Sequence, residues 1–199
     1  MQQAISRGHD VVAVVRDASK VSQDVAIRTL DVTTMTSVAV AGADADVVIA
    51  SISGRAAQNY QVVAQTAKQL LQHLPQAGKP RLLWVGGAGS LEVAPGVTLV
   101  STPEFPEEFK AEAIAQGEAL DVFRATDSAI EWTYVSPAAI IFTGESEGQY
   151  RLGGDEFFTD VQGQSRVSVV DYAKAMLDEA MLDETKNAKH LNQRISLAY

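Results

Sequence analysis

Short runs of aliphatic and β-branched residues alternate with longer stretches whose apolar positions repeat every three or four residues. The run Val11–Val15 is apolar on both faces, which is typical of a buried parallel strand. Between Gln58 and Leu74 the apolar residues recur at helical spacing and predict an amphipathic helix. Further strands are expected at Ala26–Leu30, Asp46–Ile52, Arg81–Val85, Glu131–Val135 and Arg194–Ala198.

Two more helices complete the alternation, at about Pro106–Ala125 and Val169–Leu182. Ser168 and Asp171 have the spacing of a capping box at the start of the second of these helices. Strands that alternate with helices predict an α/β fold with a parallel sheet between two helical layers. We expect residues 1–199 to form a single domain.

Composition excludes several classes of function. The chain has 16 basic and 25 acidic residues and a formal charge of −9, which disfavours nucleic-acid partners and anionic membranes. It has no cysteine, so disulfides and a cysteine nucleophile are excluded. No long apolar run predicts a membrane span, and the first residues lack the apolar core of a signal peptide. We therefore expect a cytoplasmic protein.

Arg16 directly follows the strand Val11–Val15. In a doubly wound nucleotide-binding unit, the second strand ends beside the adenosine ribose, where an arginine favours a 2′-phosphate. Arg16, helped by Lys20, therefore indicates NADP, while Asp17 keeps NAD open. The alternative is a surface arginine after an edge strand.

Small residues also follow the strand Asp46–Ile52. Ser53 and Gly54 would let a flat cofactor approach the backbone, and Arg55 could meet a phosphate or an acidic substrate. The alternative is an ordinary turn between a strand and a helix.

Gly86 and Gly87 follow the strand Arg81–Val85 in the stretch RLLWVGGAGSL. As a pyrophosphate-binding turn this stretch fits poorly, because Glu92 stands where the third glycine is expected. We expect these glycines to allow a sharp turn at the carboxyl end of a central strand, where open α/β sheets bind ligands.

The remaining polar residues indicate no further site. The three histidines lack metal-ligand spacing, so no metal is expected. Asp178, Glu179 and Asp183 could be taken for paired catalytic carboxylates, but charges at this spacing are typical of a solvated helix face.

The sequence as a whole resembles the atypical short-chain dehydrogenase/reductases with an NAD(P)H-binding, NmrA-like domain, and within them the NADH-flavin reductases. Five segments support the resemblance: RGHDVVAVVRDASKV, DVVIASISG, LLWVGGAGSL, EWTYVSPAAIIFTGE and SVVDYAKAMLDE. It implies a Rossmann-type, doubly wound fold, with residues 143–190 forming a small lobe on the substrate side. The candidate cofactor-binding residues are Arg16, Asp31, Val32, Ser51, Ile52, Ser53, Gly54, Gly86, Gly87 and Pro137, and the candidate substrate residues are Arg55 and Lys110.

The sequence departs from this family in its proton donor. Typical short-chain reductases use a Tyr-x-x-x-Lys pair, and no tyrosine of this chain is followed four residues later by lysine. The resemblance then implies an NAD(P)H-dependent reductase, NADP being favoured, whose acceptor is a flavin (FMN or FAD) or quinone-like and takes its proton from water. The alternative is a non-catalytic NAD(P)-sensing regulator, and a nucleotide-sugar epimerase is less favoured. We expect a monomer or homodimer with a small-molecule acceptor.

A second departure lies at the start of the chain. Met1–Arg7 is expected to be the tail of a helix that Gly8 ends, and family members place a strand and a G-x-x-G-x-x-G turn before that helix. We expect this first strand, which is central in the strand order 3-2-1-4-5-6, to be missing together with the pyrophosphate-binding turn. Direct pairing of Val11–Val15 with Asp46–Ile52 would contradict this expectation. Without the turn, dinucleotide affinity should be poor.

Overall fold

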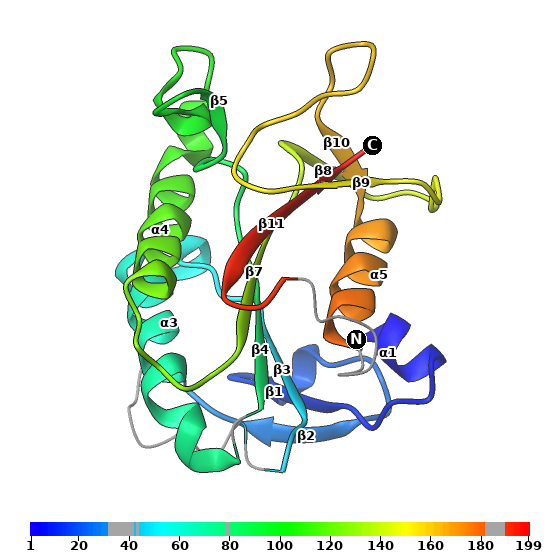
Figure 1. The fold of residues 1–199 in the computed structure, drawn as a ribbon. Helices are drawn as coiled ribbons and strands as arrows, with labels where there is room; N and C mark the ends of the chain where they lie inside the picture. Colours follow the sequence, from blue (N-terminus) through cyan, green and yellow to red (C-terminus); the bar gives the residue numbers. More distant parts are fainter. Residues whose placement is uncertain (32–41, 43, 79, 182–189) are drawn as a thin grey trace.

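A five-stranded sheet forms the centre of the protein. The computed structural model describes residues 1–31, 42, 44–78, 80–181 and 190–199. The strands follow the order β3-β4-β7-β11-β9, in which the first four are parallel and β9 is antiparallel to β11 (Figure 1). Their bounds are Val47–Ala50 (β3), Arg81–Val85 (β4), Trp132–Ser136 (β7), Gln193–Ala198 (β11) and Arg151–Gly153 (β9).

Helices cover both faces of this sheet. On one face, α3 (Gln61–His73) and α4 (Glu107–Arg124) enclose a core that includes Trp84, Phe123 and Tyr134. On the other face, α5 (Val169–Ala180) packs on Leu83, Val135 and other sheet residues, and the short helix α1 (Gln2–Ser6) lies beside α5 (Figure 1). The predicted three-layer, Rossmann-type α/β fold is therefore confirmed.

Two strands form a separate small sheet. β1 (Val12–Val15) pairs in parallel with β2 (Ala26–Thr29), and within the described residues no ladder joins β1 to β3. In Figure 1 the two blue strands run across the view, at a steep angle to the central strands. Val12 and Val14 are 42% and 36% exposed, and Ile49 of β3 is 43% exposed. We expected Val11–Val15 not to pair directly with Asp46–Ile52, and no such pairing is observed among the described residues.

Shorter elements that the sequence pattern did not predict lie around the sheet. β5 (Glu92–Ala94) and β6 (Val97–Thr98) form an antiparallel hairpin. β8 (Ile140–Phe142) pairs in parallel with β10 (Arg166–Ser168). The described 3₁₀ turns are η1 (Ala18–Lys20), η3 (Arg55–Ala57), η4 (Leu74–Ala77) and η5 (Leu99–Ser101).

Local backbone geometry explains where two helices stop or start. Gly8 has a φ of 79°, a conformation that suits glycine, and α1 ends just before it as predicted. Gln58 has a φ of 49°, which a helix cannot include, so α3 begins at Gln61 rather than at the predicted Gln58. Ser168 caps α5 as predicted, because its Oγ accepts a hydrogen bond of 3.0 Å from the Asp171 N–H.

The prediction that Glu179 faces solvent is wrong. Its side chain is 5% exposed and forms an ion pair with Arg81 at the start of β4. His190 Nδ1 lies 2.9 Å from the other carboxylate oxygen, and the Arg81 guanidinium also donates to the Glu179 carbonyl oxygen. Helix periodicity could not reveal this burial, because both partners come from other parts of the chain.

Candidate functional site

The carboxyl ends of β3, β4 and β7 meet at one edge of the central sheet. The register pairs Ala50 with Trp84 and Val85 with Val135, so the residues after these strands lie side by side. The Gly86 N–H donates a 2.9 Å hydrogen bond to the Val135 carbonyl oxygen, which extends the pairing past the end of β4. The structure therefore brings seven predicted cofactor residues to one edge: Ser51, Ile52, Ser53, Gly54, Gly86, Gly87 and Pro137.

Two buried side chains of α4 fasten the turns at this edge. Glu112 Oε2 accepts a hydrogen bond of 3.1 Å from the Gly54 N–H. The Gln116 side chain donates to the Ile52 carbonyl oxygen at 2.9 Å and accepts from the Trp84 indole at 3.0 Å. Sequence patterns missed both residues, because a polar position on a helix gives no sign that a loop some 60 residues away will cover it.

Tyr134 fixes the turn after β4. Its hydroxyl donates to the Gln116 carbonyl oxygen at 2.8 Å and accepts from the Gly87 N–H at 3.3 Å. A Cβ on Gly86 would lie 2.1 Å from the Tyr134 ring, and a Cβ on Gly87 would lie 3.2 Å from Gln116 Cβ. Packing against Tyr134 therefore requires a glycine at Gly86, in addition to the turn that the sequence suggested, while a side chain at Gly87 would press on Gln116.

Four of the five tyrosine hydroxyls are bonded within the protein. Burial raises the pKa of Tyr134 and of Tyr172 well above the usual range, and the Tyr172 hydroxyl donates to the Val135 carbonyl oxygen at 2.7 Å. Burial, with the nearby Asp178 carboxylate, raises the pKa of Tyr150 to about 12. The Tyr199 hydroxyl donates to Asp171 at 2.5 Å. The raised pKa values make Tyr134, Tyr150 and Tyr172 poor proton donors near neutral pH, and the Tyr199 hydroxyl proton is already bonded to Asp171.

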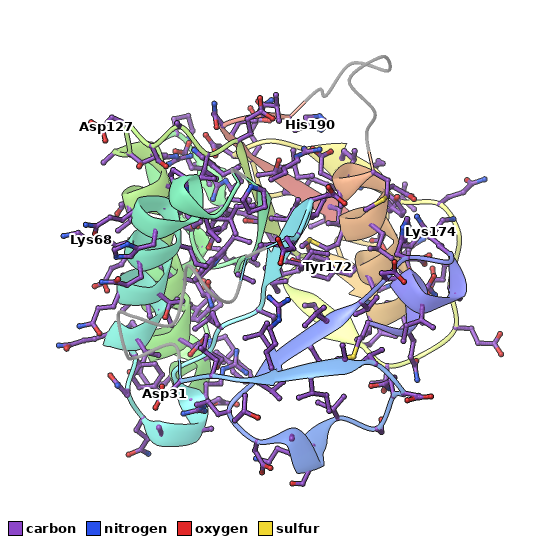
Figure 2. The ribbon with its side chains drawn as sticks, turned by 90° about the horizontal axis from the view of Figure 1, so that it is seen from below. Asp31, Lys68, Asp127, Tyr172, Lys174 and His190 are labelled. Atoms are coloured by element: carbon purple, nitrogen blue, oxygen red, sulfur yellow. The ribbon has the colours of Figure 1, made fainter. Side chains whose placement is uncertain are left out.

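Arg16 and Asp31 come just after the two strands of the separate β1–β2 sheet. Both are exposed, and Figure 2 shows Asp31 at one end of that sheet. Within the described part of the chain, the Arg16 guanidinium has no hydrogen-bond or ion-pair partner, which leaves it available for a phosphate group. Val32 lies outside the described residues. Among the described residues, no hydrogen bond links Arg16 to the edge formed by β3, β4 and β7.

The predicted residues fit the two ends of a nicotinamide dinucleotide better than its middle. Arg16 offers a cation for a ribose phosphate, and the exposed Ser51 and Ser53 offer hydroxyls at the carboxyl end of β3. The buried Ser136 hydroxyl, next to Pro137, has no hydrogen-bond partner among the described residues. None of the predicted residues supplies the row of backbone N–H groups that holds a pyrophosphate.

The two predicted substrate residues lie on neighbouring elements. The Arg55 guanidinium carbon lies 5.5 Å from the centre of the Phe109 ring, on the first turn of α4. Lys110 follows Phe109, and its Nζ lies 3.5 Å from a Glu107 carboxylate oxygen in an exposed ion pair. The structure thus brings Arg55 next to the start of α4, close to the Gly54 turn.

Asp171 ties a further loop to the start of α5. Its buried carboxylate accepts hydrogen bonds from the Ser146 hydroxyl, the Glu147 N–H at 2.8 Å and the Tyr199 hydroxyl. The sequence indicated only its capping position, because its partners come from the segment before β9 and from β11. The residues from 146 to 148 are therefore held firmly at the edge of the molecule.

Two cavities lie away from this edge. One of about 250 Å³ borders the start of β11 and includes Arg124, Asp155 and Arg194 in its lining. The other, of about 550 Å³, lies between the ends of α3 and α4 and includes Lys68 and Val122. Neither cavity is lined by a predicted site residue. The candidate site at the ends of β3, β4 and β7 therefore lies outside both cavities.

The described residues include no group of three or more histidine and acidic side chains that could hold a metal ion. None of the helices described is both long enough and apolar enough to cross a bilayer.

Comparisons with known proteins agree with this geometry. The chain is 41% identical over 193 residues to the uncharacterized protein YwnB of Bacillus subtilis (strain 168), which covers 95% of this chain and 89% of YwnB. A predicted exported protein of Burkholderia pseudomallei has a similar crystal structure, with a TM-score of 0.85 at 36% identity, covering 100% of this chain and 91% of that one. SP1627 of Streptococcus pneumoniae TIGR4, a predicted NADH-flavin reductase, gives a TM-score of 0.85 at 34% identity, covering 99% and 90%.

The sequence profile of the NAD(P)H-binding family matches residues 1–180, which include all the candidate cofactor residues. The expected cofactor class, a nicotinamide dinucleotide, is thereby supported. By this match, the chain belongs to the NAD(P)H-binding family.

Proposed function

We propose that this NAD(P)H-binding oxidoreductase passes hydride from NADPH to a flavin or quinone-like acceptor without a tyrosine proton donor. The hydrogen bonds and the raised pKa values of the tyrosine hydroxyls support it most directly. The hydroxyls of Tyr134, Tyr150, Tyr172 and Tyr199 are bonded within the protein, and the pKa values of the first three are raised. Reduction of a simple carbonyl needs an acid at the oxygen, whereas a flavin or quinone delocalises the incoming charge and takes its proton from water.

In this proposal the protein contributes mainly placement. A nicotinamide cofactor supplies the hydride when it is bound. Ser53, Gly86 and Pro137 would face the nicotinamide end, and Arg16 would bind the 2′-phosphate that distinguishes NADP from NAD. Holding donor and acceptor in contact can by itself contribute a large part of the rate, because it removes the entropy cost of their encounter.

The acceptor is proposed to be anionic. Arg55 directly follows Gly54 and packs on Phe109, the residue before Lys110, and Arg55 has no carboxylate partner among the described residues. A flavin nucleotide offers a planar ring together with a phosphate, which such cations recognise. The similarity to the predicted NADH-flavin reductase of Streptococcus pneumoniae supports the same class of acceptor.

The test combines turnover with binding. NADPH oxidation is followed with FMN, FAD and a simple quinone, beside a titration of NADPH and NADH that uses no acceptor. We expect turnover on at least one acceptor, tighter binding of NADPH than of NADH, and a loss of that preference in Arg16→Ala. Tyr60 is the fifth tyrosine and is not among the four whose hydroxyls are bonded within the protein. Because the proposal needs no tyrosine proton donor, Tyr60→Phe should retain full turnover.

Two outcomes would contradict the proposal. Binding without turnover on any acceptor would favour an NAD(P)-sensing regulator, which would use the same fold without chemistry. A loss of activity in Tyr60→Phe, with binding unchanged, would restore a tyrosine proton donor.

A further inference from the structure

Glu112 is a carboxylate buried inside the domain without a cation. Glu112 is 5% exposed and lies on the buried face of α4. Its Oε2 accepts from the Gly54 N–H at 3.1 Å, and its Oε1 accepts from the Gln116 amide at 3.3 Å. No lysine or arginine among the described residues forms an ion pair with it.

The carboxylate lies next to the candidate cofactor site. Gly54 ends the small-residue turn after β3, and the same Gln116 that contacts Glu112 also holds the Ile52 carbonyl oxygen and the Trp84 indole. Glu112 is thus bonded directly to one of the turns that we assign to the cofactor.

The carboxylate meets two donors, the Gly54 N–H and the Gln116 amide, and a glutamine could accept from only one of them. These two bonds explain the two acceptor oxygens, but burying a full negative charge without a cation remains costly. Buried titratable groups that touch a ligand-binding edge are frequent at functional sites, where the charge acts on the ligand.

We propose that Glu112 positions the Gly54 turn and that its negative charge favours the oxidised nicotinamide over the reduced one. This inference rests on the proposed function for the position of the cofactor. When hydride leaves a dihydronicotinamide, two electrons and a proton depart together to the acceptor, and the ring is left with one positive charge. A fixed negative charge in a poorly hydrated site attracts that cation and has little effect on the neutral reduced ring.

The test is the ratio of two affinities and does not depend on turnover. The dissociation constants of NADP⁺ and NADPH are measured by titration for the wild type and for Glu112→Gln, which removes the charge and keeps an acceptor for Gly54. The variant also loses the acceptor for the Gln116 amide, a structural change that should affect both affinities alike and leave their ratio unchanged. We expect the constant for NADP⁺ to rise about tenfold and that for NADPH to change less than about threefold. Glu118→Gln is the matched control, because Glu118 is exposed on the same helix, and its ratio should not change.

A second variant separates position from charge. Glu112→Ala removes both, so the affinities for NADP⁺ and NADPH should both fall, while Glu112→Asp should restore part of the preference for NADP⁺. Circular dichroism and thermal unfolding of each variant establish that it is folded.

The inference and the proposed function fail in different ways. An unchanged NADP⁺ to NADPH ratio in folded Glu112→Gln would overturn the role of the charge, even if the enzyme turns over normally. Failure of the wild type to bind either form would overturn it as well. Binding with a shifted ratio but without turnover would support it and contradict the reductase alone.

Discussion

The central sheet and the β1–β2 sheet are built from similar sequences but have different surroundings. β4 and β7 have a partner strand on each side, and β7 is buried throughout. β1 pairs with β2 alone, and two of its valines are more than a third exposed. An apolar run thus predicts a strand in both places, but it does not decide whether helices and neighbouring strands will cover that strand.

The difference matters for function, because the candidate cofactor residues are divided between the two sheets. The residues after β3, β4 and β7 are fixed by Glu112, Gln116 and Tyr134. Arg16 follows β1, which pairs with β2 alone, and no hydrogen bond among the described residues fixes its side chain. We therefore expect the nicotinamide end of the site to be more rigid than the ribose end, and four predictions test this comparison.

The largest effect is expected for Trp84→Ala in β4. Trp84 is fully buried, packs on Phe123 with ring centres 5.5 Å apart and donates to Gln116. Removing it leaves a cavity and an unpaired amide, which should lower the free energy of unfolding by about 3–5 kcal/mol. Urea denaturation measures the change. A loss below about 1 kcal/mol would show that the central sheet is no better packed than β1–β2.

Hydrogen exchange compares the two sheets without any mutation. The amides of β4 and β7 lie in a ladder that is covered on both faces, whereas β1 and β2 form a ladder with exposed valines. We expect exchange in β1 and β2 to be at least about a hundredfold faster, because their opening does not require global unfolding. Equal protection, measured by mass spectrometry or NMR, would show that the whole domain opens as one unit.

Asp171→Asn tests whether the loop attached to α5 adds to the stability of the central unit. Burial alone raises the pKa of Asp171, but hydrogen bonds from Ser146, Tyr199 and two backbone N–H groups outweigh it and lower the pKa to about 2. Since the folded pKa is lower than the unfolded one, the carboxylate stabilises the fold above about pH 4, and this contribution disappears as the pH falls toward 2.

We expect Asp171→Asn to lower the free energy of unfolding by about 2 kcal/mol at neutral pH, with the deficit shrinking between about pH 4 and pH 2. Urea denaturation at a series of pH values measures it, with the exposed Asp121→Asn as a control that changes little. A deficit independent of pH would mean that the carboxylate charge is not the stabilising element.

The smallest effect is expected in β1. Val14→Thr keeps the shape and strand preference of a half-exposed residue, so the free energy of unfolding should stay within about 0.5 kcal/mol of wild type. Val135→Thr makes the same change in β7 at a fully buried position, where the added hydroxyl should cost about 1–3 kcal/mol. Equal costs at the two positions, in parallel urea melts, would indicate that Val14 is covered in solution.

Much of the fold could be predicted because its signals are local. Apolar runs located the four parallel strands of the central sheet to within two residues, and Ser168 marked the start of α5. The short strands β5, β6, β8, β9 and β10 escaped prediction, because two or three residues give no periodicity. The site was predicted as a set of strand ends, while the side chains that fasten those ends were not.

The sequence by itself determined the alternation of strands and helices, the membership in the NAD(P)H-binding family and the lack of a Tyr-x-x-x-Lys pair. Tertiary structure alone decided that Glu112 meets Gly54, that Gly86 makes room for Tyr134, and that Glu179 is buried against Arg81, 98 residues away in the chain. The reason is physical. Backbone preferences act over a few residues and can be read along the chain, whereas the burial of a charge depends on partners that only folding brings together.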